Sequence, residues 1–325
     1  MKYLLSPLFV AVFLNGCGDR GTETVSKPDI DRISSSVEEV SKSGEDWNKS
    51  EANDTVEKSE NSLSEKELTK NKPEELSADS KISLLQAILK KANPDYRGQG
   101  KIYEEDGEIV AAEFPSCGLK DLSPLRGLKL EALDLSGNPV REIRHLRGMP
   151  LTRLFLEYTL VESLEELREA KLVELRLNGS PVRSLSGLEG HPLENLYAVG
   201  TQINNISALA SSNLRQLWLT ESPVTDLSPL EGLPLVSLTA HRTLVEDLSF
   251  VRKLPLLQRL HIGETLIKDL TPLGGLNLTR LVFTPGRIER GMEVVRSLSN
   301  LGEIGTKFDD QGRDLMPPDA FWAQF

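Results

Sequence analysis

The sequence has few of the residues that build metal sites or disulfide frameworks, with two cysteines and four histidines among 325 residues. The histidines, His145, His191, His241 and His261, do not follow the spacing of metal ligands on a single helix or strand. Two cysteines allow at most one disulfide, which excludes a disulfide-rich scaffold. We therefore expect neither a metal nor another cofactor.

Positive charge is also in short supply, since 38 Lys and Arg stand against 49 Asp and Glu, a net charge of −11. Most of the excess lies in residues 18–80, where seventeen acidic residues accompany nine basic ones. Such a segment buries too little apolar surface to offset its ordering entropy, so we predict a disordered linker over residues 17–80 that spans roughly 45 Å. The remaining residues are nearly balanced in charge, which argues against nucleic acid as a partner.

Long apolar runs are absent except at the N-terminus, where residues 3–14 form one behind Lys2. This run is short for a membrane span and is typical of an export signal. Its end, Leu14-Asn15-Gly16-Cys17, resembles the lipobox of bacterial lipoproteins, in which the cysteine is acylated. The resemblance implies a signal peptide over residues 1–16 and a lipid such as palmitate on Cys17. An ordinary cleaved signal and an uncleaved anchor are the alternatives. Gly18 in place of Asp favours the outer membrane or surface of a bacterial envelope.

Leucines recur with a regular period from residue 109 onward. Nine units begin at Ile109, Leu130, Leu151, Leu172, Leu193, Leu214, Leu235, Leu257 and Leu278, with a step of 21 residues except for one step of 22 after Leu235. If the first residue of each unit is position 0, apolar residues return at positions 0, 3, 5, 10, 13, 16 and 19. Positions 3 and 5 alternate as in a strand, and one unit is too short to enclose a core. The units must therefore stack on one another.

The second half of each unit carries turn signals. Ser123-Pro124, Ser228-Pro229 and Thr271-Pro272 place a capping residue before a proline that suits a first helical turn, so we expect a short helical or 3-10 turn after each strand. The aspartates at position 12 are Asp121, Asp226, Asp247 and Asp269. We expect them to hydrogen-bond the local backbone rather than to bind calcium.

Position 8 holds mainly small polar residues, which can satisfy the turning backbone. Its occupants are Cys117, Asn138, Thr159, Ser180, Thr201, Ser222, Thr243 and Thr265. If Cys17 is acylated, Cys117 has no partner for a disulfide, and we expect it to be a buried thiol.

These residues resemble the leucine-rich repeat, and the pattern LxxLxLxxxxVxDLSPLxGLP is similar to the short, internalin-like bacterial type. The resemblance covers residues 109–290. It implies an α/β solenoid in which nine parallel strands line a concave sheet and short 3-10 or helical turns form the convex side.

Different sequences flank the array, as the ends of a solenoid require. Residues 81–108 predict a helix that ends near Asn93-Pro94, followed by a hairpin that turns at Asp106-Gly107. Residues 291–325 predict a helical C-terminal cap closed by Phe321 and Trp322. This end is similar to that of repeat proteins from planctomycete and verrucomicrobial bacteria.

No catalytic constellation can be assigned from the sequence, and repetition itself argues against the unique site that catalysis needs. The Gly-Gly pair in residues 273–276 has the context of a repeat turn rather than of a phosphate loop. We expect His191, in an apolar column, to be a packed structural histidine. Strand geometry places His241 and His261 roughly 8 Å apart, which disfavours a shared metal ion. We therefore predict that the protein is not an enzyme.

The repeat pattern does not constrain the residue types on the concave face of the predicted sheet. Positions 2, 4, 6 and 7 line it, and the predicted ligand-binding residues there are Phe155, Tyr158, Arg176, Tyr197, Trp218, His241, Arg242 and His261. Aromatic residues and arginine dominate interface hot spots, and exposed aromatic clusters mark partners. The alternative is that the rings only cover one another on a curved sheet. Acidic residues lie toward the first strands and Arg242, Arg259 and Arg280 toward the last, which could orient a protein ligand.

The leading hypothesis is a lipid-anchored binding module of the cell envelope, a monomer that captures a protein partner on its concave face. Binding of an envelope glycan and a scaffold without a specific ligand are the alternatives. Planar aromatic rings flanked by polar groups would also suit sugar rings.

Overall fold

A computed structural model describes residues 78–307 and 314–324, which belong to one compact unit. The predicted signal peptide, the lipidation site Cys17 and the acidic linker up to residue 77 lie outside the described residues. Within the described ranges, no helix is long and apolar enough to cross a membrane.

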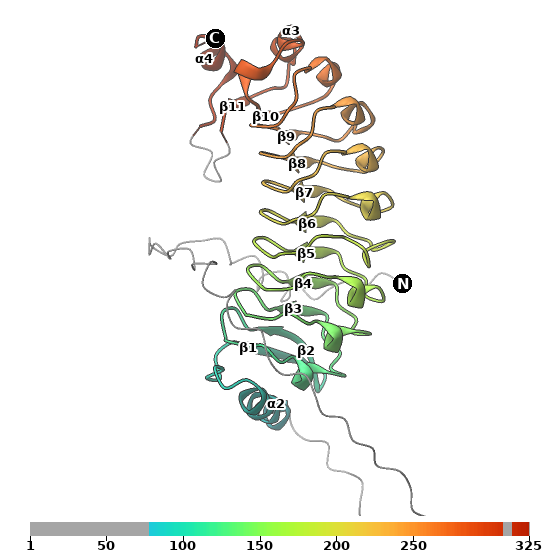
Figure 1. Cartoon of the computed structure of the whole chain (residues 1–325), viewed down its shortest axis with the longest axis vertical. Helices are drawn as coiled ribbons and strands as arrows, with labels where there is room; N and C mark the ends of the chain where they lie inside the picture. Colours follow the sequence, from blue (N-terminus) through green and yellow to red (C-terminus); the bar gives the residue numbers. More distant parts are fainter. Residues whose placement is uncertain (1–77, 308–313, 325) are drawn as a thin grey trace, which may run out of the picture. The chain divides into compact units, whose positions relative to one another are not determined.

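One sheet runs the length of the array, with its strands in the order of the sequence. Its strands are β1 (Lys101–Glu105), β2 (Glu108–Glu113), β3 (Ala132–Asp134), β4 (Arg153–Phe155), β5 (Glu174–Arg176), β6 (Asn195–Tyr197), β7 (Gln216–Trp218), β8 (Ser237–Thr239), β9 (Arg259–His261), β10 (Arg280–Val282) and β11 (Glu303–Gly305). The first pair is antiparallel and every later pair is parallel. Figure 1 shows the strands stacked in sequence order, with the helical turns along the opposite side of the solenoid. The predicted α/β solenoid is confirmed.

The interior consists of the apolar columns that the period predicts. The position 3 leucines Leu133, Leu154, Leu175, Leu196, Leu217, Leu238, Leu260 and Leu281 are all fully buried. They lie side by side, because the strand register pairs each one with the leucine of the next repeat. Each repeat therefore closes the core of its neighbour, and the array has one continuous core instead of nine small ones.

Position 8 supplies the hydrogen bonds that let the chain leave the strand. The hydroxyls of Thr159, Thr243 and Thr265 each donate to the carbonyl oxygen three residues earlier, at 2.8 Å. Asn138 bridges two repeats, since its Nδ2 donates to the carbonyl of Phe114 at 2.6 Å and its Oδ1 accepts the amide of Leu119 at 2.9 Å. Cys117 is a buried free thiol, as expected, and burial raises the pKa of its thiol.

The turns after the strands are 3-10 helices in most repeats. They are η2 (Ser123–Leu125), η3 (Arg144–Leu146), η4 (Glu165–Leu167), η5 (Ser207–Leu209), η6 (Ser228–Leu230), η7 (Ser249–Lys253), η8 (Thr271–Leu273) and η9 (Pro285–Arg287). The repeat that begins at Leu172 has no such turn. There Gly187 has a φ of +98°, and a Cβ atom on it would lie 2.6 Å from the carbonyl oxygen of Leu164. The chain still turns here, because the amides of Leu188 and His191 donate to the carbonyls of Leu185 and Leu188 at 3.1 and 3.2 Å.

The residue that caps these turns is not the predicted serine. Asp226 Oδ1 accepts the amide of Ser228 at 2.8 Å and its Oδ2 accepts the Ser228 hydroxyl at 2.9 Å. Asp121 holds Ser123 in the same way. Serine is thus a donor inside the turn, whereas the aspartate at position 12 is the acceptor, because its carboxylate can accept two bonds at once. The local backbone role predicted for these aspartates is confirmed.

Both ends of the array are covered. Helix α2 (Ala78–Ala92) buries Leu85 and Leu89 at the first end. The hairpin that follows turns at Asp106-Gly107 as predicted, and both residues have positive φ values. At the other end α3 (Met292–Arg296) and α4 (Pro318–Trp322) flank β11, a strand that the sequence did not predict. Phe321 of α4 is fully buried, with its ring 5.8 Å from that of Phe283.

Candidate functional site

Position 4 residues form one row across the concave face. The register pairs Phe155 with Arg176, Arg176 with Tyr197, and Tyr197 with Trp218, then continues through Thr239 to His261. Neighbouring strands lie about 4.8 Å apart, so consecutive side chains of the row can touch. The structure brings the predicted residues together in two groups along this row. One group is on β4 to β7, and the other is at the ends of β8 and β9.

The first group is a stack of three rings and one guanidinium. The Arg176 guanidinium carbon lies 4.4 Å from the centroid of the Phe155 ring and 5.2 Å from that of Tyr197. Tyr197 and Trp218 meet edge to face, with centroids 5.3 Å apart and planes at 70°. Contacts of both kinds are favourable. We call these four residues the aromatic ladder.

Exposure differs strongly along the aromatic ladder. Phe155 is 5% exposed, so the expectation of a solvent-facing ring at this position is wrong: Arg176 covers it. Tyr197 and Trp218 are half-buried, which leaves part of both rings accessible. The Tyr197 hydroxyl donates to Gln216 Oε1 at 2.8 Å, which fixes the ring from its polar end. The accessible part of the ladder is therefore its β6 to β7 end.

The charge of Arg176 is paired with a carboxylate of the protein itself. Its Nε and one terminal nitrogen lie 2.8 and 2.7 Å from Glu174 Oε1. Burial opposes the charge, but Glu174 and then Glu157 outweigh it and raise the pKa of the guanidinium. Burial also raises the pKa of Glu157, although Arg176 and an amide bond from Asn178 at 2.6 Å oppose that effect. We conclude that Arg176 orders the two rings beside it rather than reaching outward to a partner.

Tyr158 is the most exposed large apolar side chain of the described residues, at 72%. Its φ is +54°, a left-handed conformation that is costly for a bulky residue. The same position holds Gly137, Gly179 and Gly200, also with positive φ values, and the conformation recurs in every repeat except the last, where Pro285 occupies the position. The Tyr158 ring lies over Gly179, where a Cβ atom would approach it to 2.6 Å. Other non-glycine residues at this position, such as Glu221 and Glu264, have the same conformation, so it is the exposed ring that distinguishes Tyr158.

Arg242 and His241 are tied into a charge network at the same edge. Arg242 bonds Glu221 at 2.7 Å and Glu264 at 2.9 Å, and these bonds, Glu264 first, raise the pKa of its guanidinium. Glu221, Arg242 and Glu264 all have positive φ values. His241 is 3% exposed and lies 3.5 Å from Glu264. Both predicted residues therefore have partners in the protein, and His241 is covered.

His261 is half-buried on β9, and burial, followed by the charge of Arg280, lowers the pKa of its imidazole to about 4. It is neutral at pH 7. In the part of the chain that the structure describes, no cluster of three or more His, Cys, Asp or Glu side chains has the geometry of a metal site. His191 is 1% exposed, and its Nδ1 accepts the amide of Leu172 at 3.3 Å, as a structural histidine would.

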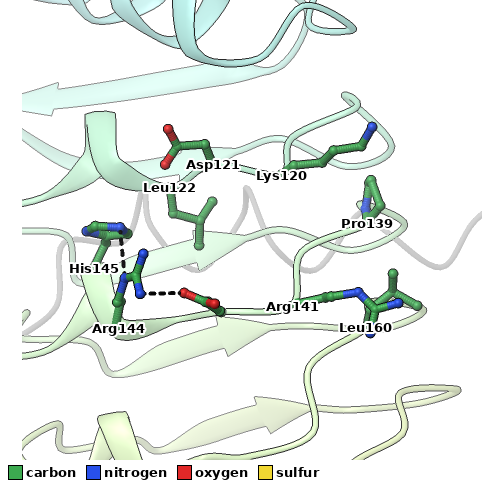
Figure 2. A pocket seen from close by; sticks show the side chains of 9 residues that line it. Lys120, Asp121, Leu122, Pro139, Arg141, Arg144, His145 and Leu160 are labelled. Atoms are coloured by element: carbon green, nitrogen blue, oxygen red, sulfur yellow. Dashed lines mark hydrogen bonds and ion pairs between the residues drawn. The ribbon is translucent and has the colours of Figure 1, made fainter. Parts of the chain in front are cut away.

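A shallow groove of about 460 Å³ lies away from the sheet, between the turns of the first repeats. Figure 2 shows Lys120, Asp121, Arg141, Arg144 and His145 around it. Arg144 pairs with Glu142 at 2.8 Å and Ser123 occupies both oxygens of Asp121. These charges largely neutralise one another, so the concave face remains the stronger candidate.

Comparison with known proteins is informative at the level of the fold. No protein-family description matches the sequence, and no curated protein matches it either. Among solved structures, internalin C2 of Listeria monocytogenes is similar, with 27% identity, a TM-score of 0.55, and coverage of 62% of this chain and 92% of that one. An internalin (inlF) of the same species gives 24% identity and a TM-score of 0.52 over 60% of this chain. The chain spans 61% of the length of that structure. The period, the columns and these similarities together show that the chain has the fold of a leucine-rich repeat solenoid.

Proposed function

We propose that this protein is a non-enzymatic binding module that captures a protein partner on its concave face. The observation that carries the proposal is the accessible end of the aromatic ladder, where Tyr197 and Trp218 are held edge to face and keep part of their rings exposed. Rings fixed in the free protein lose little entropy on binding. Because position 4 faces the concave side rather than the leucine core, the fold does not require aromatic residues there.

Tyr158 extends the proposed site to the edge of the sheet. Its ring is exposed and lies over Gly179, next to the β4 end of the ladder. Phe155 belongs to the support of the site, because Arg176 covers it. The proposed contact residues are therefore Tyr158, Tyr197 and Trp218, whereas Phe155 and Arg176 position them.

Photo-crosslinking in intact cells tests this proposal. A photoreactive residue replaces Tyr197 in one variant and Leu244 in the control, which is 48% exposed at a turn outside the concave face. We expect a protein adduct of defined mass from Tyr197 and none from Leu244. The adduct should disappear when Trp218→Ala is added. Equal labelling from both positions, or adducts that contain only glycan, would exclude a protein site on this face.

We also propose that Cys17 carries a lipid that anchors the module in the outer membrane or at the surface of a bacterial envelope. The support is the sequence Leu14-Asn15-Gly16-Cys17 behind the apolar run. Cells given labelled palmitate should transfer the label to the wild-type protein and not to Cys17→Ala. Label in the Cys17→Ala variant would exclude this site, and labelled protein confined to the inner membrane would exclude the outer one.

A further inference from the structure

The accessible side chains on the concave face are polar or positively charged beyond Trp218, on strands β8 to β10. The next three strands, β8 to β10, present Ser237, Thr239, Arg259, His261 and Arg280. The register places Arg259 between Ser237 and Arg280 in the position 2 row. In the position 4 row Thr239 lies between Trp218 and His261. Ser237 and Thr239 are buried, at 7% and 2% exposed, so the accessible region beyond the aromatic rings consists of His261 and the two arginines.

The charge of this region is only partly compensated. Arg280 donates to Glu303 at 2.6 Å and its side chain is 32% exposed. Among residues 78–307 and 314–324, no carboxylate forms an ion pair with Arg259, which is half-buried on β9. Burial first, and then Arg280, His241 and Arg259, lower the pKa of His261, whereas Glu303 opposes them. The positive potential at β9 therefore comes from guanidinium groups and persists at all physiological pH values.

The opposite end of the same face is acidic. Glu113 lies on β2, Asp134 on β3 and Glu157 just after β4. Glu113 pairs with Lys101 of β1 at 3.6 Å, whereas Arg176 is bonded to Glu174, so that Asp134 and Glu157 form no ion pair with a cation among the described residues. An acidic ligand group is therefore repelled at the β2 to β4 end and attracted at the β9 to β10 end, which fixes the direction in which a charged partner can lie.

We propose that the partner presents an acidic side chain to Arg259 and an apolar side chain to Tyr197 and Trp218. This inference rests on the proposed function, because it concerns the same face. Arginine binds carboxylates in a planar, bidentate manner, and a half-buried guanidinium that has no carboxylate among the described residues is suited to that contact. Ser237 lies next to Arg259 in the register and borders the contact on its β8 side.

The strand spacing sets the separation of the two groups on the partner. Trp218 on β7 and Arg259 on β9 are two strands apart, about 9.6 Å at 4.8 Å per strand, and two residues apart along the strand direction, about 6.6 Å, because the register places His261 and not Arg259 in the row of Trp218. The direct separation is therefore about 12 Å. Successive side chains of an extended peptide point to opposite faces, so the two groups must be an even number of residues apart, and four residues at about 3.3 Å each span about 13 Å. A segment with the pattern aromatic-x-x-x-acid fits the face.

Two capped octapeptides test this inference, acetyl-Gly-Ser-Phe-Ser-Gly-Ser-Glu-Gly-amide and the same peptide with Gln in place of Glu. Binding to the full chain is followed by NMR on the arginine side-chain and tryptophan indole resonances. We expect the Glu peptide to bind about tenfold more tightly than the Gln peptide, because a charge-assisted bond replaces a neutral one. In Arg259→Gln the two affinities should become equal. The control Arg183→Gln removes the same charge from an exposed turn and should keep the difference.

Equal affinities in the wild type, or absence of binding by both peptides, would overturn the carboxylate contact. A difference that Arg183→Gln abolishes as well would also overturn it, because the effect would then come from net charge. None of these results affects the crosslinking from Tyr197, so a failure here leaves the proposed function standing. Conversely, loss of the Tyr197 adduct would remove the proposed function whatever the peptides show.

Discussion

Leu217 and Trp218 are neighbours on β7, and the alternation of the strand predicts opposite roles for them. Leu217 is fully buried and pairs in register with Leu196 and Leu238, whereas Trp218 is half-buried on the concave face. Replacing Leu217 by Ala leaves a cavity between two stacked repeats and should cost about 2 to 5 kcal/mol of the free energy of unfolding. Trp218→Ala loses mainly the contact with the Tyr197 ring, which is worth about 0.5 to 1.5 kcal/mol.

Urea unfolding followed by far-UV circular dichroism measures both costs without using the tryptophan signal. Leu217→Met serves as the matched control, because a swap that conserves volume should cost less than about 1.5 kcal/mol. Partner capture should show the reverse order, with Leu217→Met retaining it and Trp218→Ala losing it. If Trp218→Ala is the more destabilising change, the two faces of the sheet have been assigned the wrong way round.

The turns allow further predictions. Gly200 has a φ of +66° and open space where a Cβ atom would lie, so Gly200→Ala should cost about 1 kcal/mol in thermal or urea unfolding. Gly179→Ala should cost more, and Tyr158→Ser should relieve the excess, because the added Cβ would meet the Tyr158 ring at 2.6 Å; an additive double variant would contradict this contact. The hydroxyl and amide of Ser249 lower the pKa of Asp247 below its ordinary value of 3.8. A lowered pKa in the folded state stabilises the protein above the unfolded-state value, so stability should fall as pH drops below about 4. Asp247→Asn should flatten that fall in urea midpoints measured from pH 2 to 6, and an unchanged pH profile would show that the carboxylate is not linked to folding.

Much of the fold follows from local requirements that repeat along the chain. The leucines at position 3 and the small polar residues at position 8 predict a strand and the turn that follows it. The leucines fill the core between adjacent repeats, and the polar residues hydrogen-bond the backbone of the turn. The pattern also predicts the aspartates at position 12 as turn residues, although it assigns the cap to their serine neighbours, which is wrong. The predicted hairpin at Asp106-Gly107 follows from the same kind of local rule.

The site could be predicted only as a set of positions. Phe155 and Trp218 occupy the same position in two repeats, yet one ring is covered and the other is half-buried. The difference comes from Arg176 on the intervening strand, and no pattern in the sequence says on which ring an arginine will stack. The left-handed conformation at position 7 was not predicted, because Tyr158, Arg242 and Glu264 share that position and residues of these types rarely adopt it.

The strand β11 was missed for a related reason. Ile304 pairs with Leu281 of β10 and is fully buried, so the segment keeps the inward residue of position 3. It is hard to recognise in the sequence because Thr306 stands where position 5 is usually apolar.

The period, the inward columns and the turns can be read from the amino-acid sequence, because stacking imposes identical demands on every repeat. The folded chain was needed to show which concave residues are covered, which charges are already paired, and that the guanidinium of Arg259 has no carboxylate among the described residues. These properties depend on contacts between concave side chains of neighbouring repeats. The repeat does not fix the residue types at these positions, so each contact depends on the particular pair of side chains.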